Sequence, residues 1–489
     1  MQYRIYPPIG IARVGNSESF FIGPEAPGSR GVDVAADGSE TPVSAYKDAN
    51  FDTRKQAARF RIFQFENDTD VGRELQLPAG AHIEWAVRLV NKKDAVARDQ
   101  DPPKPPTAGQ RFRPVLEAGM SDRVIDTGRH TVQGPNAVAQ ELKGVYRGKP
   151  VKLGALRTDG QGRLIVTGGD GRSEDLGGVP TGSGNYFDNR GHYDDVSDGP
   201  VTAQIVMGDG SRVEAMPAWV VVGPPDYAPA VGGLVTLLDL ILDVAYAQGW
   251  KTLPARPSFA TDIQPLLQRS QNHRWVNGSN LWARVKTSGP ELETPDTSAT
   301  AVKAREDIVK LLVTSLPEAL SHPDRADTKF ELRAWQKTLL AQWASGNFDT
   351  AASPALSGAQ ALTHAALSGA VGYTLFPGIE VGVIMRDPSI YAAPFDFRID
   401  HAQVQPGDLT ALMALPWQAD FAACRDFWWP AQRPNQVVLA DGSTDDWERP
   451  PYSSLSGFVD DVMKFGFVVP TTDMGGNAVQ HETGRADAP

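Results

Sequence analysis

The residues best able to do chemistry lie between Pro406 and Pro434, in the stretch PGDLTALMALPWQADFAACRDFWWPAQRP. This stretch contains the only cysteine of the chain, Cys424, four residues after Asp420. A single thiol cannot form a disulfide within the chain, so it must be a packing residue, a nucleophile, a ligand or a covalent anchor. If the segment is helical, the spacing of four places the carboxylate and the thiol on one face, one turn apart.

Aromatic residues flank this pair at Trp417, Phe421, Phe427, Trp428 and Trp429. They would give the carboxylate a low-dielectric environment, in which an aspartate is rarely found without a polar task. A simpler interpretation is that Asp420 caps a helix and Cys424 is a small buried hydrophobe. The residue types alone leave both interpretations open.

Several motifs, in one order along the chain, resemble the L-lysine 6-oxidase and glycine oxidase family. The most specific is ALPWQADFAACRDFWWPAQRP, and the others are IGIARVGNSESFFIGPE, RKQAARFRIF, WAVRLVNKKDA, LRTDGQGRLIVTGG, HYDDVSDGPVTA and FPGIEVG. Members of this family are amino-acid oxidases whose cofactor, cysteine tryptophylquinone, is made from a cysteine and a tryptophan of the chain itself. Several motifs in a fixed order are far more specific than any single one.

The resemblance implies a reaction and roles for particular residues. The reaction is oxidative deamination of an amino acid or other primary amine with dioxygen, which releases the carbonyl product, ammonia and hydrogen peroxide. Cys424 would carry the thioether of the cofactor, and Asp420 matches the family acid that serves cofactor formation and proton transfer. A flavin-dependent maturation enzyme would be a partner.

The tryptophan of the cofactor is where this sequence departs from the family pattern. In relatives the modified indole lies downstream of the cysteine in a segment of the form W-x-x-L-G-F, and the equivalent here, VMKFGF, begins with Val462. Trp447, in DDWERP, is then the candidate for the quinone. The alternative is a relative that has lost the quinone and acts as a cofactor-free or differently equipped biosynthetic enzyme, or as a binding protein.

A loop rich in acidic residues, NYFDNRGHYDDVSDGPVTA, contains Asp188, Asp194, Asp195 and Asp198. Such a set could bind a metal, but aspartates in a Gly-rich turn more often form caps and Asx-turns, and their spacing does not match a calcium loop. We therefore expect no metal. By resemblance, an aromatic residue beside the paired aspartates helps to shape the substrate pocket, and Tyr193 is the candidate.

The secondary structure expected to position these residues changes along the chain from strands to helices. RFRIFQFE and HIEWAVRLVNKK alternate apolar and polar residues with the period of half-buried strands. Two hairpins are predicted, with turns at Asp159–Gly160 and Asp209–Gly210. The middle section has helical spacing, and Gly346 is the expected C-cap of its last helix. The segment 288–301 is polar and is expected to be an exposed loop.

These patterns predict an α+β fold that is irregular and loop-rich. We expect a β-rich region at 1–230, a helical region at 231–350 and a mixed catalytic region at 351–489 that carries the Asp420/Cys424 motif, all in one compact unit. The core of the helical layer is expected to contain Trp275, Trp282, Trp335 and Trp343.

Three further polar residues lie in apolar surroundings. Glu380 is part of the apolar run FPGIEVGVIM, which is typical of a strand, and we expect it to pair with Arg386 or Arg398 rather than face the site. His364 and His401 stand apart from any nucleophile or ligand cluster, so we interpret each as a polar surface or capping residue.

The composition excludes several classes of partner. The chain has 489 residues, 41% hydrophobic and 22% charged, as is typical of a globular protein. Its net charge of -12 argues against nucleic acid and against anionic membranes as partners. The most apolar run, GGLVTLLDLILDVAYA, is too short and too charged to span a bilayer. With no signal-peptide pattern and one cysteine, we expect a cytoplasmic homo-oligomer.

Overall fold

The structure is a computed structural model that describes residues 1–67, 70–96, 114–177, 189–320, 331–374, 378–423, 431–449, 455–473 and 476–486. In its first half, sixteen strands join in one mixed sheet. These are β1 (Gln2–Tyr6), β2 (Ile9–Arg13), β3 (Phe20–Ile22), β4 (Val32–Val34), β5 (Glu40–Pro42), β6 (Lys55–Phe65), β7 (Arg73–Glu74), β8 (His82–Val87), β9 (Val90–Asn91), β10 (Ile125–Asp126), β11 (His130–Gln133), β12 (Gln140–Tyr146), β13 (Lys149–Thr158), β14 (Leu164–Gly168), β17 (Ser197–Val206) and β18 (Arg212–Gly223).

The sheet is ordered β10-β9-β17-β18-β1-β6-β14-β13-β12 along its main path. Most neighbours are antiparallel, but β18 pairs in parallel with both β1 and β2, and β3 pairs in parallel with β6. The predicted strands around 60–65 and 83–87 are confirmed as β6 and β8. The β-rich first half therefore follows from the period-two pattern of its segments.

Both predicted hairpin turns are present. Between β17 and β18, Gly210 has a φ of +84° and Asp209 Oδ1 accepts from the N–H of Ser211. Between β13 and β14 the turn begins at Asp159 as expected, but the residue with positive φ is Gly162 (+74°). A left-handed conformation favours glycine because it has no Cβ, so the left-handed glycine of this turn lies two residues after the Gly160 that the Asp-Gly pair indicated.

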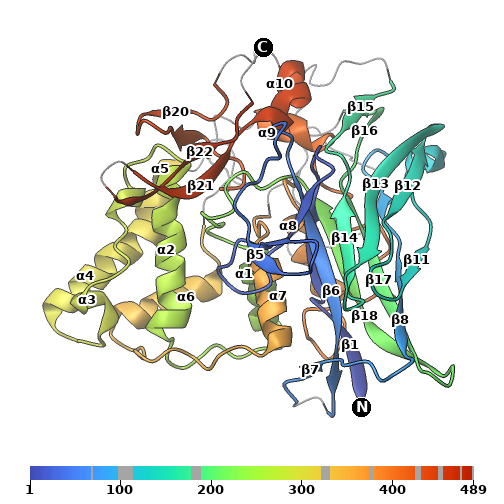
Figure 1. Cartoon of the computed structure of the whole chain (residues 1–489). Coiled ribbons are helices and arrows are strands. Elements are labelled where there is room, and N and C mark those ends of the chain that lie inside the picture. Colours follow the sequence, from blue (N-terminus) through green and yellow to red (C-terminus); the bar gives the residue numbers. More distant parts are fainter. Residues whose placement is uncertain are drawn as a thin grey trace.

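The second half begins with a helical layer. Its helices are α1 (Leu237–Ala247), α2 (Gln264–Asn272), α3 (Pro290–Glu293), α4 (Ala299–Lys310), α5 (Leu316–Leu320), α6 (Ala334–Ala344) and α7 (Gly358–Ser368). Thr236 and Asp239 form a capping box at the start of α1, and Gly346, with a φ of +84°, follows α6 as predicted. Figure 1 shows α1 and α7 between the outer helices and the sheet.

The C-terminal section mixes short helices and hairpins. It contains α8 (Gly382–Met385), α9 (Trp417–Ala423), α10 (Leu455–Asp461), β19 (Gln436–Val438), β20 (Thr444–Asp446), β21 (Phe467–Thr472) and β22 (Ala478–Thr483). A separate pair, β15 (Ser173–Asp175) and β16 (His192–Asp194), comes from the first half. In Figure 1, α10 lies at the top of the molecule with α9 just below it, and the strands β20, β21 and β22 lie at the upper left, near α5.

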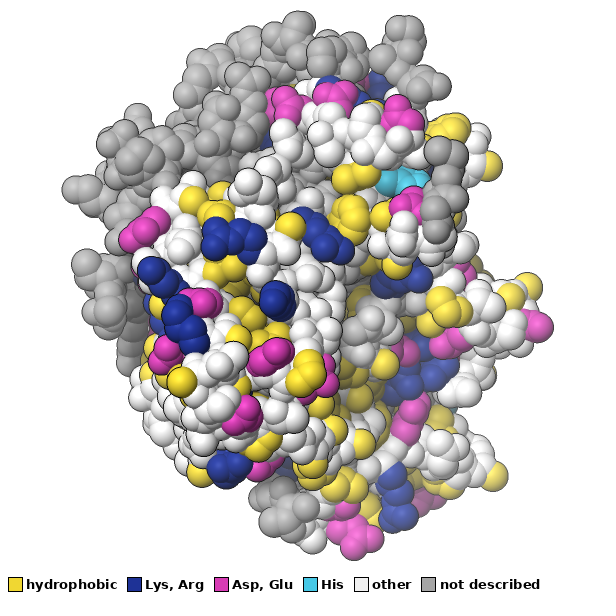
Figure 2. All heavy atoms as spheres, turned by 90° about the vertical axis from the view of Figure 1, so that its left-hand side faces the viewer, with side chains coloured by type: hydrophobic (Ala, Val, Ile, Leu, Met, Phe, Trp, Pro, Cys, Tyr) yellow, Lys and Arg dark blue, Asp and Glu magenta, His cyan; other side chains and the backbone are white. Residues whose placement is uncertain are grey.

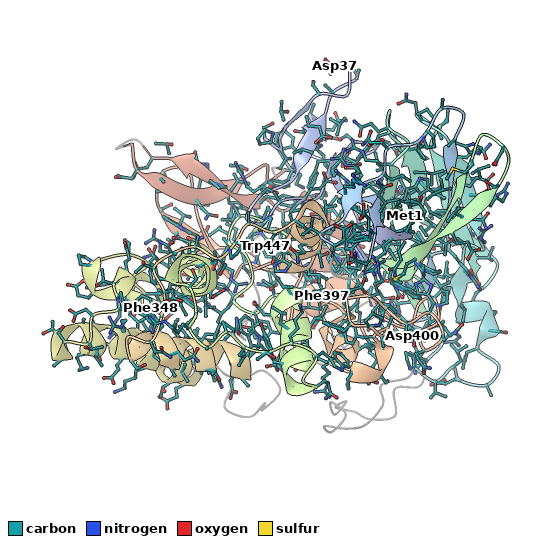
Figure 3. All side chains as sticks on the ribbon, turned by 90° about the horizontal axis from the view of Figure 1, so that it is seen from below. Met1, Asp37, Phe348, Phe397, Asp400 and Trp447 are labelled. Atoms are coloured by element: carbon teal, nitrogen blue, oxygen red, sulfur yellow. The ribbon has the colours of Figure 1, made fainter. Side chains whose placement is uncertain are left out.

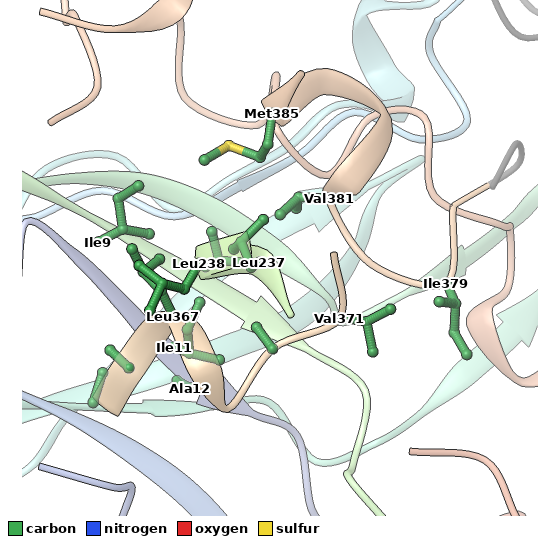
Figure 4. Packing of buried hydrophobic residues seen from close by; sticks show 14 of the residues in the cluster. Ile9, Ile11, Ala12, Leu237, Leu238, Leu367, Val371, Ile379, Val381 and Met385 are labelled. Carbon is green, nitrogen blue, oxygen red and sulfur yellow. The ribbon is translucent and has the colours of Figure 1, made fainter. Parts of the chain in front are cut away.

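The main hydrophobic core draws residues from all three sections of the chain. Figure 4 shows its centre, where Ile9 and Ile11 of β2 pack against Leu237 and Leu238 of α1, and against Leu367 of α7. The four tryptophans predicted for the helical layer are confirmed as part of this core or packed against it. The α+β prediction is therefore confirmed, with one continuous core joining the layers.

Two local predictions need correction. The segment 288–301 is largely exposed as expected, but it is not a loop throughout, because it contains α3 and the start of α4, and the fully buried Arg305 donates to the carbonyls of Glu291 and Asp296. The run around Glu380 is not a strand but leads into the short helix α8.

The outer face of the helical layer carries charges of both signs. In Figure 2, lysine and arginine side chains are interspersed with aspartate and glutamate among neutral residues on this face. The coloured part of the view has no extended patch of a single sign. Within the described ranges, no helix has the length and apolar character needed to cross a membrane.

Candidate functional site

Helix α9 carries Asp420, and a buried carboxylate fixes the amino end of this helix. The N–H of Trp417 donates to Oδ2 of Asp194 at 2.9 Å. The same carboxylate forms an ion pair with Lys93, and neither side chain is exposed. Asn91 Nδ2 donates to its Oδ1 at 3.0 Å. Because the first N–H groups of a helix have no partner inside the helix, a carboxylate there satisfies a donor and interacts favourably with the helix dipole.

The carboxyl end of α9 is held by Arg433, whose side chain is only 1% exposed. Its Nε donates to the carbonyl oxygen of Phe421 at 2.6 Å, and its Nη2 donates to Oε2 of Glu448 at 2.7 Å. The last carbonyls of a helix also lack partners within the helix, so this arginine caps α9. The helix is therefore fixed at both ends by charged groups, and the one at its amino end comes from a distant part of the chain.

Asp420 is buried on this helix, with 1% of its surface exposed. Trp417 and Phe421 are equally buried and meet edge to face, with 5.1 Å between ring centroids. Helix α10 packs against α9. The prediction that DFAAC is helical is confirmed for Asp420 to Ala423, while Phe427, Trp428 and Trp429 of the predicted aromatic surroundings lie outside the described residues. Cys424 lies outside the described residues, directly after the last residue of α9.

A second buried carboxyl group, that of Asp195, directly follows Asp194 in the sequence. Its Oδ2 accepts from the N–H groups of Gly171 (2.7 Å) and Arg172 (3.2 Å), while its Oδ1 has no hydrogen-bond partner within the described residues. Burial, and then the charge of Asp194, raise the pKa of Asp195 to about 7. The protonated form is therefore well populated at neutral pH.

The turn that binds Asp195 also contacts α9 and the segment after α10. Gln418 Nε2 donates to the carbonyl oxygen of Gly171 at 3.1 Å. Gly171 has a φ of +72°, and a Cβ at this position would lie 2.5 Å from the Cε of Met463. The positive φ favours glycine at this position. Sequence reasoning did not assign Asp195 or Gln418 to the site; the paired aspartates of HYDDVSDG were the available signal.

Asp198, another acidic residue of the loop NYFDNRGHYDDVSDGPVTA, binds different groups from those that Asp194 and Asp195 bind. Asp198 accepts from the N–H and the hydroxyl of Thr410, and from Nε1 of Trp219 at 3.0 Å. Its burial raises its pKa to about 6. Asp188 lies outside the described residues. The described aspartates therefore each bind a different backbone or side-chain donor.

Tyr193 is buried in β16, with 6% of its surface exposed. Its hydroxyl donates to Oε2 of Glu174 at 3.1 Å, and its ring lies 5.2 Å from that of Tyr146. Side chains alternate across a strand, so Tyr193 points to the face of β16 opposite to Asp194, which contacts α9. The role of Tyr193 in a substrate pocket remains a prediction.

Trp447 follows β20 and is fully buried. Its Nε1 donates to the carbonyl oxygen of Gly466 at 3.1 Å, and its ring lies 4.8 Å from Tyr227 and 4.7 Å from Phe465. The guanidinium of Arg433, which caps α9, lies 5.3 Å from its ring centroid. Figure 3 shows Trp447 near the middle of the view, between the helical layer and the sheet.

Val462 is also fully buried, at the end of α10. Its carbonyl oxygen accepts from the hydroxyl of Tyr227 at 2.8 Å. The next carbonyl, of Met463, accepts from Oγ1 of Thr53 at 2.9 Å and from Nζ of Lys47. Three side chains from the first half of the sequence thus fix the backbone of this segment beside α9.

Glu380 forms the structural ion pair that we expected, but with a different partner. Its Oε1 accepts from Nη1 of Arg13 at 2.6 Å, and its Oε2 accepts from the N–H of Val371 at 2.7 Å. The predicted partners, Arg386 and Arg398, were chosen because they are close in sequence. The actual one comes from β2, which the sheet brings against this segment.

His364 and His401 are half-buried rather than on the surface. The ring of His401 meets that of Trp219 edge to face at 4.9 Å, and the ring of His364 lies 6.3 Å from that of Phe397. Burial lowers the pKa of both histidines. Both histidines are thus only partly exposed and also contact aromatic rings, so the prediction of a polar surface or capping residue holds only in part.

Comparison with known proteins identifies the family of this chain. The family profile described as L-lysine epsilon oxidase N-terminal matches residues 6–222, and the one described as L-lysine epsilon oxidase C-terminal domain matches residues 318–445. The second range contains Asp420 and Cys424 and ends before Trp447 and Val462.

Individual relatives agree. The chain is 29% identical to the L-lysine 6-oxidase of Marinomonas mediterranea, over 87% of this chain and 71% of that protein. The crystal structure of the L-Lys epsilon-oxidase from the same organism has the same fold, with a TM-score of 0.80 and 22% identity over 99% of this chain and 94% of that one. Its Schiff base intermediate with L-Lys matches equally, with a TM-score of 0.80 and 22% identity over 99% of this chain and 95% of that one. With both family profiles matched in order, the second of them over the buried helix of Asp420, this chain belongs to the L-lysine 6-oxidase family of amino-acid oxidases.

Proposed function

We propose that this chain oxidatively deaminates an amino acid or other primary amine with dioxygen, and releases the carbonyl product, ammonia and hydrogen peroxide. The cofactor is a cysteine tryptophylquinone formed from Cys424 and Trp447 with the help of a flavin-dependent maturation enzyme. When formed, this group supplies the electrophilic carbonyl that condenses with a primary amine, which no standard side chain offers.

The observation that carries the proposal is the arrangement at the carboxyl end of α9. Arg433 caps the carbonyl oxygen of Phe421 and lies over the ring of Trp447. The ring of Tyr227 lies 6.3 Å from that of Phe421 and 4.8 Å from that of Trp447. Two side chains thus contact both Trp447 and Phe421, which precedes Cys424 by three residues in sequence, and this supports Trp447 as the candidate partner of Cys424.

Asp420 is the proposed proton acceptor. Its carboxylate would take the α-proton of the bound amine, and because Asp420 is 1% exposed, little water can compete for that proton. A base held on a helix that is fixed at both ends keeps its position during the reaction. The named activity of the relatives makes L-lysine the first substrate to test, followed by small amino acids.

Mass spectrometry tests the cofactor directly. We expect the intact protein, produced together with the flavin-dependent partner, to absorb visible light and to resist thiol alkylation at Cys424. Its mass should correspond to two added oxygens and a sulfur–indole crosslink. Tandem spectra should join the peptides of Cys424 and Trp447.

An unmodified mass under those conditions would contradict the quinone and favour the alternative, a family member without this cofactor. Val462, at the position where relatives have the modified tryptophan, is the residue that motivates this comparison. A crosslink to a tryptophan other than Trp447 would keep the oxidase function and correct the residue.

A further inference from the structure

A polar cavity opens between the helical layer and the hairpin β19–β20, with a volume of about 570 Å³. Its walls come from the segment after α2, from the end of α5, and from the residues that flank Trp447. The lining residues used below are Asn277, Ser279, Leu320, Gln436, Asp446 and Glu448. The volume is within the range of natural small-molecule sites.

One side chain, that of Arg433, borders both the cavity and the proposed site. Arg433 lines the cavity, caps the carbonyl oxygen of Phe421 at 2.6 Å and lies 5.3 Å from the centroid of the Trp447 ring. Asp446 and Glu448, on either side of Trp447 in sequence, line the cavity as well. Arg433 therefore borders the cavity and also contacts the indole.

The charge of the cavity favours a cation. Glu448 is neutralised by its ion pair with Arg433 at 2.7 Å. Asp446 is exposed, and no ion pair joins it to another residue in the described ranges. One uncompensated carboxylate therefore remains at the cavity, and it would attract an ammonium group.

The rest of the lining suits an amino acid. Asn277 Oδ1 is used by Nε1 of Trp282 and by the N–H of Ser279, so its amide group is held in place and the NH₂ remains as a donor. The amide of Gln436 and the hydroxyl of Ser279 add donors that a carboxylate can use. Leu320 offers an apolar surface against which a methylene chain can pack.

We propose that this cavity is a binding subsite for an amino acid with a cationic side chain, with its free ammonium group at Asp446 and its carboxylate at the amide and hydroxyl donors. The subsite rests on the proposed oxidase function for its purpose, because it would concentrate the substrate one side chain away from Trp447. Its binding chemistry does not require the quinone.

Binding is tested with Cys424→Ala protein, in which the thioether cannot form, so that binding is separated from turnover. Isothermal titration with L-lysine should give saturable binding that weakens with added salt, and L-norleucine, which lacks the side-chain ammonium, should bind more weakly. Asp446→Asn should weaken L-lysine binding about two- to fivefold, the effect of an exposed ion pair. Ser279→Tyr, which fills the cavity, should weaken it more than about tenfold.

Asp445→Asn is the matched control, since Asp445 is the neighbour in β20 and does not line the cavity. It should leave the affinity for L-lysine unchanged. Absence of binding, equal effects of the Asp445 and Asp446 variants, or unchanged binding in Ser279→Tyr would each overturn the subsite. If the Cys424→Ala protein binds L-lysine in an Asp446-dependent way while the natural protein, produced with the flavin-dependent partner, has an unmodified mass, the subsite stands and only the proposed cofactor is refuted.

Discussion

The N–H of Trp417 donates to the carboxylate of Asp194 at 2.9 Å, although 223 residues separate the two in sequence. Through this contact the β-rich half of the chain sets where the helix of the proposed base begins. The carboxylate is buried together with the ammonium of Lys93. Removing the negative charge of Asp194 would therefore leave Lys93 buried without a counter-ion.

Asp194→Asn should therefore destabilise the protein strongly. The amide can still accept from Trp417, but it leaves Lys93 buried without its counter-ion, which costs about 3–5 kcal/mol of unfolding free energy in comparable pairs. Urea unfolding followed by fluorescence would measure the loss. Glu141→Gln removes an exposed partner of Lys143 and should change the stability by less than about 0.5 kcal/mol. A loss as small for Asp194→Asn would show that the buried pair does not anchor α9.

Asp195 should make the stability depend on pH. Its pKa is raised to about 7 in the folded protein, against about 3.9 in an unfolded chain. The folded state therefore holds the proton more tightly, and this stabilising contribution is complete below pH 4 and is lost as the pH rises through 7. Asp195→Asn mimics the protonated form and can accept the same two N–H groups. We expect the variant to gain about 2 kcal/mol relative to the natural protein between pH 5 and pH 8. Equal differences in unfolding free energy at the two pH values would contradict a protonated Asp195.

Asp420→Asn should abolish turnover while leaving the fold intact, because the amide has nearly the shape of the carboxylate but cannot accept the α-proton. Peroxide release with L-lysine measures turnover, and the unfolding midpoint measures the fold. His364→Ala and His401→Ala serve as comparisons and should lower turnover by less than about tenfold, below the usual effect of losing a general base. Full turnover in Asp420→Asn would show that the family role of this acid does not apply here.

Structural features that depend on neighbouring residues could be predicted from the sequence. The helix at DFAAC, the strands with period-two alternation, the turn at Asp209–Gly210 and the glycine after α6 each depend on a few neighbouring residues. Partners that lie far apart in the chain could not be predicted. Glu380 pairs with Arg13, 367 residues away, because the sheet brings β2 to it. Nothing in the sequence around Glu380 carries that information.

The same limit applies to the candidate site. The raised pKa of Asp195 follows from complete burial beside Asp194, and burial is a property of the folded chain. Arg433 joins α9, Glu448 and Trp447, yet in the sequence it is only one residue of PAQRP. Sequence reasoning could therefore select Asp420 and Trp447 as candidates, but the contacts that link them required the structure.

Trp447→Phe tests whether this indole is more than a core residue. The variant keeps an aromatic ring between Tyr227 and Phe465 but loses the N–H that binds Gly466, so we expect it to be less stable by about 1–3 kcal/mol and still folded. Visible absorption, the crosslinked mass and peroxide release should all be lost. Trp343→Phe is the matched control, because Trp343 is also fully buried and donates its Nε1 to a carbonyl oxygen, that of Leu292, at 2.9 Å. That variant should lose a similar amount of stability and keep the cofactor signals. If both variants kept absorption and crosslinked mass, Trp447 would be a packing residue and the quinone would have to be formed elsewhere in the chain.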